Sequence, residues 1–326
     1  MNSIFLLLTE TMQRESSISF PMFGSGSINP PSYFNLFGRN IYFYGVIVAF
    51  AFILGTLYCT KKAKLVGIRA DDVYDVLLWL IPLCIVGARI YYVLFRLDYY
   101  LAHPSEIFAI WEGGLAIYGG IIVGALVIFF ICRRKKIPVM AVLDLFIIAC
   151  IIGQAIGRWG NFMNREAFGS ETDIFCRMGL TSPSGTTIYV HPTFLYESLW
   201  NLAGFIFLNW FLSSGKRKYD GQCFLIYLLW YGLGRSWIEG LRTDSLYIGH
   251  TNLRISQLLS IAMIIVSAVL LIINAKKQHK PEDLFVNRVN AGAPGVEVIP
   301  ENPENPEVAE PEEKNETTET ETDSKE

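Results

Sequence analysis

The chain has 326 residues, of which 52% are hydrophobic and 14% aromatic, and its mean hydropathy of +0.35 is too high for an ordinary soluble domain. The net charge of −3 hides two parts of opposite sign: residues 281–326 hold 14 acidic and 3 basic side chains, whereas the preceding 280 residues carry +8. The six cysteines lie mostly in apolar runs, without metal-ligand spacing or a disulfide framework. We therefore expect a membrane protein that binds no nucleic acid, metal or soluble cofactor and has no cysteine nucleophile of its own.

Seven apolar segments predict membrane-spanning helices, because each is near the roughly 20 residues that a bilayer requires. They lie at about 41–60, 73–95, 114–132, 139–157, 192–212, 222–238 and 253–274. The predicted fold is an all-α polytopic membrane protein whose two termini lie on opposite sides of the bilayer.

The lysines predict the orientation of these spans. Ten lysines fall in alternate loops or after the last span, whereas the amino terminus and the loops near 96–113, 158–191 and 239–252 contain none. Lysine-rich loops are cytoplasmic by the positive-inside rule. We therefore expect the amino terminus outside and the carboxyl terminus in the cytoplasm.

The chain divides into three predicted regions. Residues 1–40, with several prolines and glycines, form an outward-facing arm, and residues 41–280 form the seven-helix membrane domain. Residues 281–326 are rich in Glu, Pro, Asn and Thr and cannot bury a core, so we expect a disordered acidic tail in the cytoplasm.

Polar residues in the first four spans each have an ordinary explanation. Tyr44, at the start of the first span, can be an interfacial anchor. Arg89 lies about one and a half turns inside the second span, from which its guanidinium can snorkel to the surface. Tyr118 stands in a glycine-rich segment that permits close helix packing. Asp144 is costly as a lone carboxylate in the fourth span, so we expect a structural pair with a basic side chain at the cytoplasmic rim.

The richest polar stretch follows the fourth span and reads Gly157-Arg158-Trp159-Gly160-Asn161-Phe162-Met163-Asn164-Arg165-Glu166-Ala167-Phe168-Gly169. It combines fixed cations, a carboxylate, amide groups and glycines that let backbone approach a ligand. That mixture suits an anionic headgroup, whereas a solvated loop with a glycine-rich helix end is the simpler alternative.

The fifth and sixth spans bring further charges to the same outer side. His191, before Pro192 at the start of the fifth span, is either a helix cap or a functional group. Glu197 lies about a turn and a half inside this span, so we expect it to partner an arginine.

One face of the sixth span is polar. Tyr231, Arg235 and Glu239 recur every four residues and therefore share a helix face, and Arg242 follows about one turn later. Ion pairs within one helix would satisfy these charges, but they would not explain why charges stand in a membrane span.

The stretch at 157–169 resembles, position by position, the signature G-R-x-G-N-F-x-N-x-E-x-x-G of the prolipoprotein diacylglyceryl transferases. The resemblance extends over residues 41–275 and includes Tyr44-Gly45, the His191-Pro192 pair and the tyrosine, arginine and glutamate of the sixth span. The chain departs from the family at Tyr118, where a histidine proposed as a base in some members is usual. A tyrosine with an ordinary pKa near ~10 is a poor base, although it can donate a hydrogen bond.

The resemblance implies an activity in the bacterial plasma membrane. Enzymes of this family move the diacylglyceryl group of phosphatidylglycerol onto the lipobox cysteine thiol in the signal peptide of a prolipoprotein. The products are a thioether and glycerol phosphate, so the leaving phosphate needs charge stabilisation and the thiol must reach its thiolate form.

The resemblance also implies roles for residues. Arg158 and Arg235 would hold the phosphate, because a guanidinium fork matches phosphate oxygens. Glu166 would either position Arg158 or take the thiol proton, and Tyr118 would be the catalytic-site hydrogen-bond donor. The expected substrate-binding residues are Tyr44, Arg89, Asn161, Gly169, Tyr231, Glu239 and Arg242.

A phospholipid transporter or scramblase could use the same arginines as a headgroup site. A relay of that kind would distribute charged sites across both leaflets, whereas the membrane charges other than Asp144 cluster toward the outer side. A scaffold without chemistry would leave the arginines in the spans unexplained.

Overall fold

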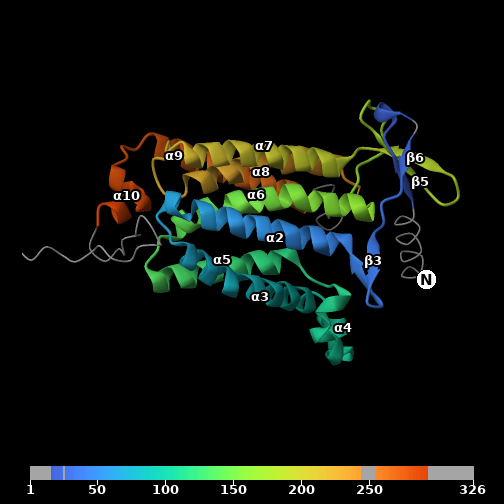
Figure 1. The fold of residues 1–326 in the computed structure, drawn as a ribbon, viewed down its shortest axis with the longest axis horizontal. Helices are drawn as coiled ribbons and strands as arrows, with labels where there is room; N and C mark the ends of the chain where they lie inside the picture. Colours follow the sequence, from blue (N-terminus) through green and yellow to red (C-terminus); the bar gives the residue numbers. More distant parts are fainter. Residues whose placement is uncertain (1–15, 25, 244–253, 293–326) are drawn as a thin grey trace, which may run out of the picture.

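The computed structural model describes residues 16–24, 26–243 and 254–292, and within them seven long helices lie side by side in one bundle (Figure 1). They are α2 (Phe43–Lys62), α3 (Ala70–Leu94), α5 (Ile117–Lys135), α6 (Val139–Asn164), α7 (Thr193–Ser213), α8 (Gln222–Leu241) and α9 (Ile255–Ala275). The shortest has 19 residues and the longest 26, which at about 1.5 Å per residue is long enough for a hydrocarbon core of roughly 30 Å.

Within the described residues, five segments are both long and apolar enough to cross a membrane: Phe43–Val66, Ala70–Leu94, Ile117–Lys135, Val139–Asn164 and Ile255–Ala275. Helices α7 and α8 are of similar length, but they bury polar side chains such as Glu197 and Glu239, which lower their mean hydropathy. The prediction of a polytopic, mostly helical membrane protein is confirmed at this level. The fifth and sixth predicted spans, which correspond to α7 and α8, and the orientation of the termini remain predictions.

Helix α6 packs against α2 and also against α7 and α8. Gly204 lets α7 approach both α6 and α8 closely, because a Cβ atom on this residue would lie 2.6 Å from Cδ1 of Ile151 on α6 and 2.6 Å from Nε1 of Trp230 on α8. Two indoles then join α7 to α8, since Trp200 Nε1 donates to the Trp230 carbonyl and Trp230 Nε1 to the Trp200 carbonyl, both at 3.0 Å. The helices that bear the polar residues are therefore held in a fixed relation.

Helices α3 and α5 form a second close pair, also joined through glycines. A Cβ atom on Gly119 would lie 2.3 Å from the Gly87 carbonyl oxygen, and one on Gly87 would lie 2.4 Å from Cγ2 of Val123. Five residues after Gly119 on α5, a Cβ atom on Gly124 would lie 3.0 Å from Sγ of Cys84. No side chain larger than hydrogen fits at these positions without movement, so the backbones touch along this half of the pair.

Strands at one end of the bundle correct the all-α prediction (Figure 1). Strands β1 (Ser17–Ser19), β2 (Ser27–Ile28), β5 (Met178–Thr181) and β6 (Thr187–Val190) form an antiparallel sheet in the order β2-β1-β5-β6. Strands β3 (Tyr33–Leu36) and β4 (Arg39–Tyr42) form a separate hairpin directly before α2. The amino-terminal arm is therefore paired through β1 with the segment that follows the signature stretch.

Short helices also occur among the described residues. They are the α-helices α4 (Leu97–Ala102) and α10 (Phe285–Asn290) and the 3-10 turns η1 (Pro21–Phe23), η2 (Ala63–Val66), η3 (Pro104–Phe108), η4 (Ile110–Glu112) and η5 (Pro281–Asp283).

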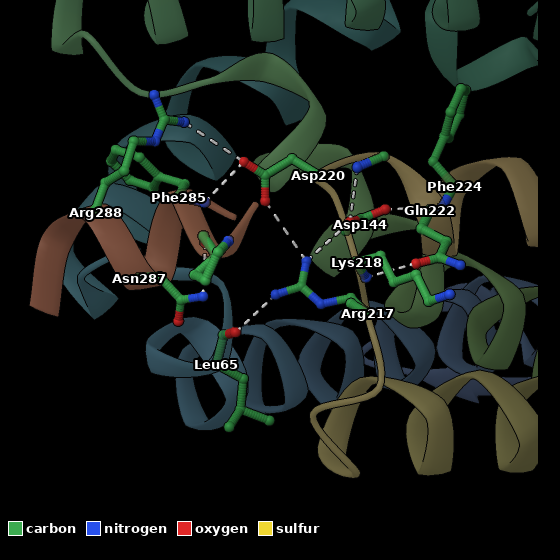
Figure 2. A network of polar contacts seen from close by, with 12 residues as sticks. Leu65, Asp144, Arg217, Lys218, Asp220, Gln222, Phe224, Phe285, Asn287 and Arg288 are labelled. Atoms are coloured by element: carbon green, nitrogen blue, oxygen red, sulfur yellow. Dashed lines mark hydrogen bonds and ion pairs between the residues drawn. The ribbon is translucent and has the colours of Figure 1, made fainter. Parts of the chain in front are cut away.

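A buried polar network closes the end of the bundle opposite the sheet (Figure 2). Asp144 of α6 is fully buried and lies 2.9 Å from Nη1 of Arg217, which confirms the expected pair with a basic side chain. The same carboxylate accepts the backbone N–H groups of Gly221 and Phe224 at 2.8 and 2.9 Å. Arg217 also donates to the Leu65 carbonyl at 2.8 Å, so the network joins α6, η2 and the start of α8.

The segment after α9 folds against this network, contrary to the prediction of disorder from residue 281. The carboxylate of Asp220 accepts the N–H of Phe285 at 2.9 Å and lies 3.7 Å from Nη2 of Arg288. Phe285 is buried, and a Cβ atom on Gly67 would lie 2.8 Å from Cα of Val286. Residues 281–292 are therefore ordered, and residues 293–326 of the predicted tail lie outside the described part.

Candidate active site

The signature stretch begins inside α6 and ends in a tight helix stop. Arg165 has a φ of +51° and donates its N–H to the Phe162 carbonyl at 3.1 Å, while the N–H of Glu166 reaches the Asn161 carbonyl at 3.1 Å. These two hydrogen bonds are those of a Schellman motif, in which the chain turns back over the last helical turn. The turn returns Glu166 to the side of Asn161, which is why the amide and the carboxylate of the signature meet.

Three helices bring two arginines to one carboxylate. Glu197 of α7 lies between Arg158 of α6, whose Nη2 is 2.8 Å from Oε1, and Arg235 of α8, whose Nη1 is 3.4 Å from Oε2. Nη2 of Arg235 also lies 2.6 Å from Oε2 of Glu239, one turn further along α8. The expectation that Glu197 partners an arginine is confirmed, and Glu197 in fact partners both. We refer to Arg158, Glu197, Arg235 and Glu239 as the arginine cluster.

Burial differs between the two signs of charge in this cluster. The side chains of Glu197 and Glu239 are 5% and 2% exposed, whereas those of Arg158 and Arg235 are 24% and 16% exposed. Among the described residues, the Nε atoms of both arginines make no polar contact, so donor capacity remains at the open side. The two carboxylates therefore hold the guanidinium groups from the buried side of the cluster, and the guanidinium groups themselves are accessible.

Asn161 links the cluster to the signature carboxylate. Its Oδ1 accepts Nη1 of Arg158 at 3.2 Å, and its Nδ2 donates to Oε1 of Glu166 at 2.9 Å. Nδ2 of Asn164 approaches the same oxygen at 3.4 Å. Glu166 is exposed and contacts Arg158 only through Asn161, so both predicted roles of Glu166 remain chemically possible.

Two predicted tyrosines flank the last turns of α6. The ring of Tyr44 packs against Gly160, where a Cβ atom would lie 2.5 Å from Cδ2 of the tyrosine. Tyr231 is half-buried one turn before Arg235 and stacks on Tyr227 with ring centroids 5.6 Å apart. Both rings therefore lie on elements that contact the arginine cluster or its helix.

Gly169 and Arg242 meet where three segments cross. Gly169 forms an antiparallel bridge with Arg242, and its N–H donates to the His191 carbonyl at 2.9 Å. A Cβ atom on Gly169 would lie 2.6 Å from Cβ of His191 and 3.0 Å from the Leu241 carbonyl oxygen. These contacts join the end of α8 to the start of α7. Close packing alone therefore explains why a glycine stands at position 169, whether or not a ligand binds there.

Arg89 is committed to a loop. Its Nε donates to the Ile107 carbonyl at 2.9 Å, Nη2 to the Glu106 carbonyl at 2.6 Å, and Nη1 to the Gly113 and Gly114 carbonyls at 2.8 and 3.0 Å. The side chain is buried, and its guanidinium group donates to backbone oxygens instead of reaching the membrane surface as expected. The structure does not bring Arg89 into the arginine cluster.

Tyr118 lies in the first turn of α5 and is 36% exposed. Its hydroxyl makes no hydrogen bond within the described part of the chain. The structure therefore gives no partner that would turn this tyrosine into a base.

His191 is not a helix cap, because α7 begins without a side-chain hydrogen bond at its first turn. Its Nδ1 lies 3.4 Å from the hydroxyl of Tyr196, and partial burial lowers the pKa of its imidazole. The ring is therefore neutral near pH 7.

Arg165 was not predicted to have a role, yet its side chain is buried in the amino-terminal arm. It donates to the carbonyls of Ser16 at 2.8 Å and Pro30 at 2.6 Å and to Oγ of Ser32 at 3.1 Å. Nothing in the local sequence signals these contacts, because the partners lie more than 130 residues away. The arm is thus fastened to the residue that ends α6.

The arrangement is chemically suited to an anion. Two guanidinium groups with open donor edges can bind a phosphate by charge-assisted hydrogen bonds. In the described ranges no group of three or more His, Cys, Asp or Glu side chains is placed to hold a metal ion.

Comparisons with known proteins point to one family. The family model for prolipoprotein diacylglyceryl transferase matches residues 31–273. The chain is 45% identical over 245 residues to the phosphatidylglycerol–prolipoprotein diacylglyceryl transferase of Finegoldia magna, covering 75% of this chain and 95% of the relative. It is 44% identical over 257 residues to the enzyme of that name from Limosilactobacillus reuteri, with coverage of 77% and 92%. For the enzyme of that name from Enterococcus faecalis the identity is 43% over 264 residues, with coverage of 78% and 93%.

Proposed function

The chain belongs to the prolipoprotein diacylglyceryl transferase family, and we propose that it transfers the diacylglyceryl group of phosphatidylglycerol to the lipobox cysteine thiol of a prolipoprotein. The substrate sulfur attacks the glyceryl carbon that bears the phosphate, and an S–C bond forms as the C–O bond breaks. Glycerol phosphate leaves with the electron pair, and the thiol proton is lost to a base. The observation that carries this proposal is the pairing of Arg158 and Arg235 through Glu197.

In this mechanism the two arginines stabilise the leaving phosphate. Glu197 holds both guanidinium groups from the buried side, so their exposed edges can face the same phosphate without reorganising. Glu239 holds Nη2 of Arg235 at 2.6 Å from the same helix, so Arg235 is fixed by two carboxylates, one on α7 and one on α8. Negative charge that develops on the phosphate oxygens is therefore met by preorganised donors.

We assign the remaining signature residues to positioning and binding. Asn161 orients the headgroup and connects Glu166 to Arg158, so Glu166 acts as a positioning residue through Asn161. Tyr44 and Tyr231 are proposed to hydrogen-bond the substrate near the arginine cluster, and Tyr118 to donate a hydrogen bond from α5. Gly169, Glu239 and Arg242 shape the same end of the bundle, whereas Arg89 supports the site by holding the loop of residues 106–114.

We propose that all seven long helices span the bacterial plasma membrane, with the sheet and the arginine cluster on the outer side. The lysine distribution supports this orientation, since Lys61 and Lys62 end α2 and Lys135 and Lys136 end α5, and these helices end on the side of the bundle that carries α10 (Figure 1). In α7 and α8 the polar side chains contact one another, which makes a span with lower hydropathy tolerable in lipid.

The test is transfer to a lipobox peptide in phosphatidylglycerol vesicles, detected as the added diacylglyceryl mass. Arg158→Ala and Arg235→Ala are each expected to reduce transfer by about 10²–10³-fold, the usual effect of removing one preorganised donor to a developing anion. Arg96→Ala is the matched control, because Arg96 is exposed near the outer end of α3 and lies 5.3 Å from the Tyr92 ring. If the parent adds no mass to the peptide, the proposal is wrong, and a lipid-translocation assay then tests the scramblase alternative.

A further inference from the structure

A groove lies between α3 and α5, in the half of these helices nearer to Lys135. Its volume is about 630 Å³, and its principal lining residues are Asp75, Trp79, Leu83, Leu126, Phe130 and Arg134. The volume falls within the roughly 300–1,000 Å³ that is usual for ligand sites. None of the residues of the arginine cluster lines this groove.

The groove follows from where the glycines stand. Gly87, Gly119 and Gly124 bring α3 and α5 into backbone contact over one half of their length. In the other half the facing side chains are bulky, and Trp79 and Phe130 are largely exposed. The side chains there line a hollow, which is apolar along its walls.

The dimensions of the groove match one acyl chain. Its lining on α5 runs from Val123 to Lys135, which at about 1.5 Å per residue is roughly 18 Å. One leaflet provides about half of the ~30 Å hydrocarbon core, so the groove has the depth of a single leaflet. A transmembrane helix from another protein would instead favour small residues at its contact surface, and the walls of the groove contain large ones.

The mouth of the groove carries one available cation. Lys135 is engaged on both sides, with Nζ 2.6 Å from carboxylate oxygens of Asp72 and Asp75. Arg134 is exposed and has no ion pair or hydrogen bond to any residue that the structure describes. The neighbouring Arg133 turns away to the Phe129 ring, 5.7 Å from its centroid. A phosphate above the groove would therefore meet Arg134.

We propose that this groove binds one acyl chain of an anionic phospholipid of the cytoplasmic leaflet, with the lipid phosphate at Arg134. The site is separate from the outer arginine cluster, and it depends on the proposed topology only for the choice of leaflet. The bound lipid would cover apolar surface that α3 and α5 leave open to the bilayer.

The experiment uses Trp79 as the reporter in the full-length protein. Vesicles of phosphatidylcholine receive increasing fractions of phosphatidylserine with brominated acyl chains, or of brominated phosphatidylcholine, and tryptophan fluorescence is recorded. The contribution of Trp79 is the difference between the parent and Trp79→Phe. Phosphatidylserine is anionic but is not the proposed substrate, so the result is independent of the transfer reaction.

We expect half-maximal quenching of Trp79 at an about fivefold lower fraction of brominated phosphatidylserine than of brominated phosphatidylcholine, the factor that one cation near an anionic headgroup supplies. Arg134→Gln should abolish this preference, and the matched control Arg133→Gln should keep it. Equal quenching by the two lipids in the parent, or a preference that survives Arg134→Gln, would overturn the proposal. Absence of quenching by either lipid would also overturn it, because another protein segment would then fill the groove.

Discussion

Helix α6 contributes to two arginine–carboxylate clusters, one at each end of the bundle. Asp144 and Arg158 are 14 residues apart on this helix, or about 21 Å along its axis. Around Asp144 every group is enclosed: the carboxylate receives Arg217 and two backbone N–H groups, and the Arg217 side chain is 3% exposed. Around Arg158 the carboxylates are enclosed and the arginines are open.

The difference separates a structural cluster from a binding cluster. A buried pair whose hydrogen-bonding groups are filled has no capacity for a ligand, and its removal leaves an uncompensated charge. A pair with buried carboxylates and open guanidinium donors keeps capacity for an anion. Charge in a membrane span is therefore informative about function only together with the exposure of each sign.

Replacing a carboxylate by an amide should mainly reduce stability in the cluster around Asp144 and mainly reduce activity in the arginine cluster. Asp144→Asn leaves Arg217 without its charge partner in a closed site, so we expect a loss of about 3–5 kcal/mol in the free energy of unfolding. Denaturant unfolding in detergent measures it. The control is Asp75→Asn, whose side chain is 54% exposed beside Lys135 and should cost no more than about 1 kcal/mol. Equal losses for the two variants would contradict the description of the cluster around Asp144 as closed.

Glu197→Gln tests the open cluster. The change leaves both arginines partly hydrated but no longer aligned by one carboxylate, so we expect transfer to fall by roughly 10–100-fold. The unfolding free energy should change less than in Asp144→Asn. A variant that transfers at the parental rate would show that Glu197 does not position the arginines.

Glu166→Gln distinguishes positioning from proton abstraction. A positioning residue that acts through Asn161 should cost roughly tenfold at every pH, because a hydrogen bond to a charged partner is weakened. If Glu166 is instead the base that takes the thiol proton, hydroxide can replace it as the pH approaches the thiol pKa of about 8.5. The loss of transfer in Glu166→Gln would then become smaller as the pH rises. The pH profile of transfer for parent and variant between pH 6 and roughly 9 decides between them.

Asp220 should make the end of the bundle that carries α10 sensitive to pH. Burial raises the pKa of its carboxyl from 3.8 to about 6, so the folded protein takes up a proton more readily than the unfolded chain. This contribution to stability is fully present below about pH 3.8 and is lost as the pH rises through about 6. The difference in unfolding temperature between Asp220→Asn and the parent should therefore grow in favour of the variant over this interval. A constant difference would exclude the raised pKa.

The smallest effect is expected for Tyr118→Phe. The hydroxyl of Tyr118 contacts no described polar group, and the ring is retained by the substitution, so transfer should stay within about twofold of the parent if the hydroxyl contributes only a weak hydrogen bond. A loss comparable to that of Arg158→Ala would instead assign proton transfer to this position.

Hydropathy predicted the long helices because their lipid-facing residues dominate the average. It ended the fourth span at residue 157, whereas α6 continues to Asn164. Arg158 reaches Glu197 on α7, and Asn161 bonds to Arg158 and Glu166, so these polar side chains leave the helical hydrogen bonds intact. The spacing and type of the charges also indicated that Glu197 would meet an arginine.

Three features had no local signal. The pairing of β1 with β5 joins three-residue and four-residue strands that lie far apart in the chain. The contacts of Arg165 are equally non-local. The order of residues 281–292 depends on Phe285 entering a site that Gly67 leaves open, and an acidic composition does not reveal one buried aromatic ring.

The fastening of the arm by Arg165 also has a consequence for the order in which the protein is assembled. Arg165 and its partner Ser16 are 149 residues apart, and ribosomes add about 5–20 residues per second. The arm is therefore made on the order of ten seconds before the residue that holds it. Until α6 is in place, β1 has neither Arg165 nor β5 as a neighbour. The sheet at this end of the bundle can close only after β5 has been made, and the anion site beside it is completed later still, because Glu197 and Arg235 follow on α7 and α8.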